Sequence, residues 1–157
     1  LTEVFQLPSI GAIARLGLVL LAIFVVWMAV AQTMYTQIMG PEAPASLGEF
    51  VRQVLSTPQG HQLIVVGNAV GFLFAVAVLA LTVVSFPLLL DRDVGPGVAV
   101  RTSLRAVAAN PVPMAAWGLT VAVLLLAGCL PILIGLAVVM PLLGHGTWHL
   151  YRKVVES

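Results

Sequence analysis

Long apolar segments separated by short polar ones dominate the sequence. Residues 16–41, 63–90 and 106–151 contain no Asp, Glu, Lys or Arg. A helix needs ~20 mainly apolar residues to cross a hydrocarbon layer about 30 Å thick. The pattern therefore predicts transmembrane helices, the first two over residues 10–39 and 62–90.

The third apolar run is too long for one crossing. At about 1.5 Å per residue, a single helix over 106–151 would extend far beyond the bilayer, so two crossings must share it. Proline cannot continue the helical hydrogen bonds and glycine permits a turn, which places the break between Gly128 and Pro131. Spans over 113–128 and 131–151 complete an all-α bundle of four transmembrane helices, expected to form one integral membrane domain over 1–157.

Two amphipathic helices are predicted between the spans. Residues 46–56 begin with Ser46 and Glu49 at the spacing of a capping box, and their apolar positions recur at helical spacing. Residues 97–109 follow Pro96, a favoured residue in a first helical turn. Both segments are expected to lie along the membrane surface. Docking of 46–56 onto a partner subunit is the alternative.

The distribution of Lys and Arg predicts the orientation of the chain. Four spans put six of the seven basic residues on one side, whereas three spans would divide them four against three. Cytoplasmic loops carry an excess of basic residues, so the six-residue side and both chain ends are expected in the cytoplasm. The six are Arg15, Arg92, Arg101, Arg105, Arg152 and Lys153, and Arg52 lies opposite.

Composition excludes several classes of protein. The 157 residues are 61% hydrophobic and 8% charged, with a mean hydropathy of +1.10, which a soluble domain cannot carry on its surface. A net charge of +1 gives no basic stripe for nucleic acid. The single cysteine, Cys129, cannot form an intrachain disulfide. The lipid bilayer is therefore the expected surrounding of the chain.

One motif in the second span points to helix packing. Gly67 and Gly71 are four residues apart, which allows another helix to approach the backbone closely. Asn68 lies on the same turn, and an unpaired amide in hydrocarbon is costly. We expect Asn68 to form a hydrogen bond across a helix interface; a site for an ion or substrate is the alternative.

The C-terminal segment carries the most polar cluster. His145 and His149 share a helix face and are expected to contact backbone or lipid headgroups. A metal would need a third ligand from Asp91, from Asp93 or from another chain. The predicted lipid- or anion-binding residues are Arg101, Arg105, His145, His149 and Arg152, with Trp148 and Tyr151 as interfacial anchors at the cytoplasmic side.

No catalytic motif is present. The sequence contains no G-x-S-x-G, P-loop, H-E-x-x-H or C-x-x-C pattern. Its apolar runs also lack the chain of ionisable residues that proton relays use. We expect neither an enzyme nor a bound cofactor.

Several short patterns resemble a known family. Residues 85–91, 102–104, 110–111, Trp117 and the G-H-x-T-W-H-x-Y-R run over 144–152 are similar to the uncharacterised bacterial membrane proteins grouped as domain of unknown function 2189. The resemblance extends from about Gly17 onward, with 144–152 as its most specific part. It implies a polytopic bacterial inner-membrane protein, commonly with membrane sequence upstream, and it assigns no catalytic residue.

Leu1 in place of a starting methionine agrees with a chain that is processed or that begins within a longer protein. The leading functional hypothesis is an accessory or assembly subunit that packs against a larger respiratory or photosynthetic complex. The alternative is a small-solute or lipid transporter, or a lipid-binding protein. It would use the interior around Asn68 and the cluster of basic and histidine residues.

Overall fold

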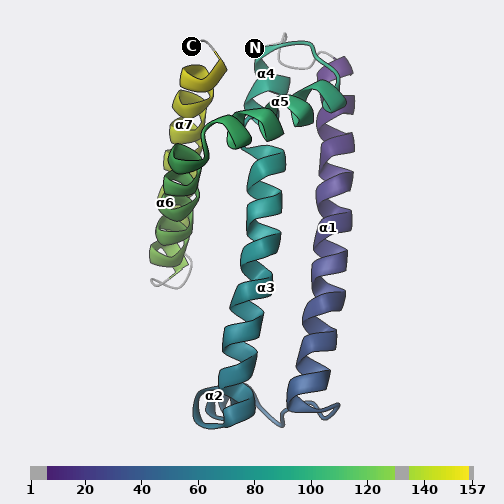
Figure 1. The fold of residues 1–157 in the computed structure, drawn as a ribbon, viewed down its shortest axis with the longest axis vertical. Helices are drawn as coiled ribbons and strands as arrows, with labels where there is room; N and C mark the ends of the chain where they lie inside the picture. Colours follow the sequence, from purple (N-terminus) through teal and green to yellow (C-terminus); the bar gives the residue numbers. More distant parts are fainter. Residues whose placement is uncertain (1–6, 130–134, 156–157) are drawn as a thin grey trace. The chain divides into compact units, whose positions relative to one another are not determined.

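A computed structural model describes residues 7–129 and 135–155, and this part of the chain is helical with no strand. Figure 1 shows its helices, coloured along the sequence. They are α1 (Leu7–Met39), α2 (Leu47–Ser56), α3 (Pro58–Thr82), α4 (Ser85–Asp91), α5 (Pro96–Ala109), α6 (Pro111–Cys129) and α7 (Leu136–Val155). The predicted all-α fold is confirmed.

Three stretches within the described residues are long and apolar enough to cross a membrane. They are Ile10–Met39, Pro58–Asp91 and Pro111–Cys129, close to the first three predicted spans. The fourth, predicted over 131–151, lies partly outside the described residues, which exclude 131–134, and its remainder falls mainly on α7. His145 and His149, followed by Arg152 and Lys153, lower the hydropathy of α7. The fourth crossing therefore stays a prediction.

The second span is broken, which the sequence analysis did not predict. Helix α3 ends at Thr82 and α4 begins at Ser85. The Ser103 hydroxyl of α5 donates to the Ala80 carbonyl at 2.7 Å and accepts from the Val84 amide at 3.2 Å. These two backbone groups would pair directly in a continuous helix, so the hydroxyl is inserted into the helical ladder. Pro87 reinforces the break because it has no amide to offer Val83.

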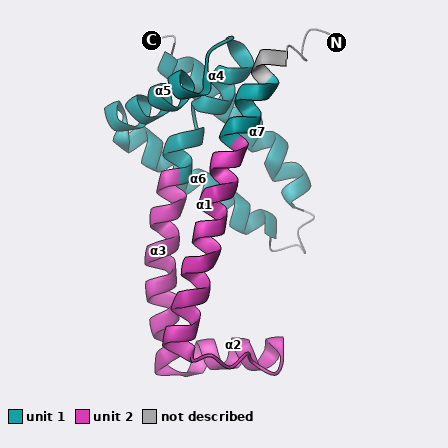
Figure 2. Cartoon of the chain, turned by 90° about the vertical axis from the view of Figure 1, so that its right-hand side faces the viewer, with its two compact units in different colours: residues 1–16, 78–157 teal, residues 17–77 magenta. Residues whose placement is uncertain are grey.

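The chain forms two compact units, coloured separately in Figure 2. Residues 17–77 make one unit, in which α1 and α3 run alongside each other and α2 lies across their ends. Gly40, at φ 100°, ends α1 in a conformation that favours glycine. Ser46 caps α2 by accepting from the Glu49 amide at 3.1 Å, as the capping box predicts.

Residues 1–16 and 78–157 make the other unit. Small side chains at Ala99, Ser103 and Ala106 are buried on α5, which allows its backbone to lie close to its neighbours. Helices α6 and α7 form a hairpin (Figure 1). A Cβ on Gly128 would lie 3.0 Å from the Leu136 side chain, so the glycine lets the two arms meet. The buried apolar side chains are Ala12, Leu16, Val83, Val84, Leu88, Leu89, Ala99, Ala106, Met114 and Tyr151.

Candidate functional site

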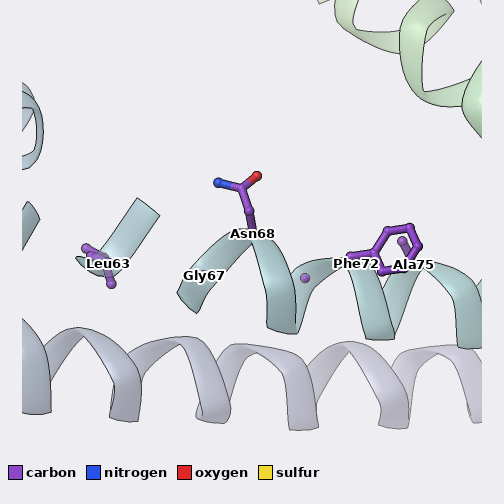
Figure 3. A pocket seen from close by; sticks show the side chains of 6 residues that line it. Leu63, Gly67, Asn68, Phe72 and Ala75 are labelled. Carbon is purple, nitrogen blue, oxygen red and sulfur yellow. The ribbon is translucent and has the colours of Figure 1, made fainter. Parts of the chain in front are cut away.

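The Gly67 and Gly71 pair of α3 lines an open groove. Figure 3 shows Asn68 projecting from this face, away from α1. The groove measures about 510 Å³ and is lined by Leu63, Gly67, Asn68, Gly71, Phe72 and Ala75. A Cβ added to either glycine would meet no atom within 4 Å. Gly67, Asn68 and Gly71 therefore line one open face of α3, with no neighbouring helix of the described chain lying against it, and their role in helix packing stays a prediction.

Only one of the two polar groups of the Asn68 side chain has a hydrogen-bond partner within its own helix. Its Nδ2 donates to the Ile64 carbonyl at 2.7 Å, and the side chain is exposed. The carbonyl oxygen of the amide has no hydrogen-bond partner among the described residues. At about 1.5 Å per residue, Asn68 lies ~9 Å along the helix from the start of the predicted span at residue 62. That depth is within a 30 Å hydrocarbon layer, where an outward-facing amide is unfavourable unless paired.

Helix α2 presents a strongly amphipathic surface in the 17–77 unit. The Phe50 and Tyr35 rings are in contact, with centroids 6.2 Å apart, so one edge of the apolar arc faces α1. The rest of the arc is exposed at Leu47 (79%), Val51 (45%) and Leu55 (63%). No residue of α2 is buried, so the described chain leaves this stripe uncovered.

The polar face of α2 is held by an ion pair. Arg52 contacts the Glu49 carboxylate at 2.6 Å, and Gln53 donates to the same carboxylate at 2.8 Å. These hydrogen bonds, that of Arg52 foremost, lower the pKa of the Glu49 carboxyl from its ordinary value. Both ionic side chains are exposed enough to be screened by solvent.

The junction of α2 and α3 is very tight. Gly60 is buried, and a Cβ there would overlap the carbonyl oxygens of Gln53 and Val54. The Thr57 hydroxyl donates to the Gln53 carbonyl at 2.7 Å and accepts from the Gly60 amide at 3.0 Å. The orientation of α2 across the end of α3 is therefore set by backbone contact.

A second groove, of about 480 Å³, lies between α6 and α7. The Trp117 ring of α6 rests on Gly146, where an added Cβ would lie 2.5 Å from the ring. The groove is lined by Trp117, Gly146, His149, Leu150, Arg152 and Lys153. It brings together two of the predicted lipid-binding residues, His149 and Arg152. Trp117 and Lys153 complete it, and the sequence analysis had not assigned either to a binding site.

The other predicted residues do not line this groove. Arg101 and Arg105 are exposed on α5. His145 has its Nδ1 2.9 Å from the Pro141 carbonyl, one turn back along α7. No group of three His, Cys, Asp or Glu side chains that could hold a metal occurs in the part of the chain that the structure describes.

The two expected anchors differ in exposure. Trp148 is 37% exposed, whereas Tyr151, expected at the lipid interface, is buried with 1% exposed. The Tyr151 hydroxyl donates to the Asp91 carboxylate at 2.8 Å. Arg92 approaches the same oxygen at 3.7 Å. Tyr151 therefore links the end of α7 to the end of α4 rather than meeting lipid.

Comparison with known protein families shows which family the sequence matches. A family model described as a predicted integral membrane protein, DUF2189, matches residues 1–91, which is more than half of the 157. The match ends before residues 144–152, the run that the sequence analysis gave as the most specific part of the resemblance. No curated protein and no solved structure matches the chain.

Proposed function

The chain belongs to the DUF2189 family of predicted integral membrane proteins, and from that premise we propose that it is a non-catalytic subunit that packs against other membrane proteins. The Asn68 face of α3 carries this proposal. An outward amide between two uncovered glycines, deep in an apolar helix, is suited to a neighbouring transmembrane helix that approaches closely and donates to the amide oxygen. The partner in this proposal is a larger respiratory or photosynthetic membrane complex.

The α2 stripe supports the same proposal from a second surface. Leu47, Val51 and Leu55 lie at the end of a transmembrane unit, where an amphipathic helix can rest on the bilayer surface or on a partner. The two uncovered surfaces, the α3 face and the α2 stripe, belong to the same 17–77 unit. One partner could therefore engage both.

The proposal includes four crossings in a bacterial inner membrane, with both ends cytoplasmic. The separation of charge supports this orientation. With four crossings, one side holds Arg15, Arg92, Arg101, Arg105, Arg152 and Lys153, and the other holds Arg52. In this proposal α6 makes the third crossing and α7 the fourth, and the hydrogen bond from Tyr151 to Asp91 supports the return of α7 to the end of the second span.

The test is a pull-down of the tagged protein from its native membrane in mild detergent, with mass spectrometry of the proteins retained at near-stoichiometric amounts. Gly71→Leu should fill the packing face and reduce retention of the partner by at least about tenfold, the effect of ~1.4 kcal/mol. Ala69→Leu is the matched control, because Ala69 is exposed on α3 but does not line the groove.

Recovery of one complex at fixed stoichiometry, lost in Gly71→Leu and kept in Ala69→Leu, is the expected result. A wild-type protein that always purifies alone would overturn the proposal. Equal retention of the partner by both variants would exclude the Asn68 face as the contact.

A further inference from the structure

We infer that the groove between α6 and α7 is a binding site for one anionic phospholipid, whose phosphate meets the cations at the end of α7. The inference is independent of the proposed subunit role, because it rests on a different unit of the chain. It begins from the way polarity changes along a single face of α7.

That face runs from apolar to cationic. Val138, Leu142, Gly146, His149 and Lys153 follow one another at intervals of three or four residues, so their side chains share one side of the helix. Val138 and Leu142 are 72% and 57% exposed. His149 and Lys153 are also exposed. A ligand lying along this face would contact apolar side chains near the start of α7 and a positively charged side chain near its end.

The length of the face suits a phospholipid in one leaflet. From Val138 to Gly146 is eight residues, or about 12 Å at 1.5 Å per residue. Half of a 30 Å hydrocarbon layer is about 15 Å. An acyl chain lying along the apolar part would therefore bring its headgroup to the level of His149 and Lys153.

The groove itself provides both kinds of contact. The Trp117 ring on Gly146 and the Leu150 side chain give apolar walls, and Arg152 and Lys153 supply positive charge. No carboxylate among the residues that the structure describes lines the groove. The nearby Asp91 accepts from the buried Tyr151 and lies beside Arg92, so its charge is engaged elsewhere. This charge balance selects an anionic headgroup over a zwitterionic one.

The experiment uses the intrinsic fluorescence of Trp117. The chain has three tryptophans, and replacing Trp27 and Trp148 by phenylalanine leaves Trp117 as the reporter. This protein is placed in lipid nanodiscs that contain phosphatidylglycerol or phosphatidylcholine with brominated acyl chains, which quench a tryptophan in contact with them.

Phosphatidylglycerol should quench Trp117 with at least about fivefold higher apparent affinity than phosphatidylcholine, the preference that one interfacial cation supplies. Lys153→Gln should reduce that preference about fivefold. Arg15→Gln is the matched control, since it removes one positive charge from an exposed position of the same unit outside the groove, and it should leave the preference unchanged.

Equal quenching by the two lipids would overturn the inference, as would equal effects of Lys153→Gln and Arg15→Gln. Inorganic phosphate or a polyglutamate peptide should not displace the quenching lipid. Displacement by phosphate would assign the groove to a free anion, and displacement by the peptide would assign it to an acidic protein segment. Either displacement contradicts a lipid site. Far-ultraviolet circular dichroism of each variant verifies that the helices are retained.

Discussion

The insertion of Ser103 into the α3–α4 junction gives the sharpest prediction for stability. The Ser103 side chain is completely buried, and its hydroxyl makes both hydrogen bonds that replace the direct pairing of Ala80 with Val84. Ser103→Ala removes a donor and an acceptor at once. The perturbation is therefore confined to two backbone groups at the break.

The expected loss follows from those two bonds. A typical intramolecular hydrogen bond contributes about 1 kcal/mol net, and side-chain bonds within membranes average about 0.6 kcal/mol. Two such bonds give about 1–2 kcal/mol. The loss rises to about 3 kcal/mol if the Val84 amide stays buried without a partner.

Unfolding in mixed detergent micelles, followed by circular dichroism, measures this difference. Thr102→Ala is the control, because the Thr102 hydroxyl bonds only to the Val98 carbonyl of its own helix at 2.9 Å. It should change the free energy of unfolding by less than about 0.5 kcal/mol. Hydrogen exchange at the Val84 amide should be faster in Ser103→Ala alone. If Ser103→Ala is as stable as Thr102→Ala and Val84 remains equally protected, the hydroxyl does not hold the break.

Three further predictions concern the helix ends and the hairpin. Gly146→Ala should destabilise the α6–α7 hairpin by about 1–3 kcal/mol because the new Cβ would overlap the Trp117 ring. Gly144→Ala is the control, because its Cβ would meet open space and should not destabilise the hairpin. Thermal melts of the two variants measure the difference. Tyr151→Phe should lower the free energy of unfolding by about 1–3 kcal/mol, because it removes the hydroxyl that donates to the Asp91 carboxylate. Unaltered stability in the same thermal melts would show that this hydrogen bond does not contribute. The pKa of the Glu49 carboxyl is lower in the folded chain than its ordinary value of 4.5. The stabilisation that the Glu49 carboxylate gives to α2 is therefore fully present above pH 4.5 and is lost as the pH falls through the lower pKa of the folded state. Amide protection of α2, corrected for intrinsic exchange rates, should therefore fall on acidification in wild type, and Glu49→Gln should remove this dependence.

The local elements could be predicted because their causes are contained in neighbouring residues. Uninterrupted apolar runs predict the three candidate spans, since any such segment must satisfy its backbone within lipid. The Ser46 cap and the start of α5 at Pro96 likewise follow from short-range chemistry. Membership of the DUF2189 family was recognised from the sequence as well, although the match covers 1–91 rather than the C-terminal run.

Pairings between distant residues could not be predicted in this way. Ser103 acts on backbone groups about twenty residues earlier, and Tyr151 reaches a carboxylate sixty residues away. Sequence spacing alone favoured an interfacial anchor at Tyr151 because tyrosine is common at membrane surfaces. Only the packing of α7 beside α4 decided that this ring is buried.

The same division applies to the candidate sites. The sequence by itself determined that Gly67, Asn68 and Gly71 share one face of a membrane helix, because helical periodicity fixes which neighbours point together. The tertiary structure decided that this face is uncovered by the described chain. It also decided that Trp117 and Lys153 join one groove, since a binding site formed by two helices depends on how their surfaces pack, which no local pattern encodes.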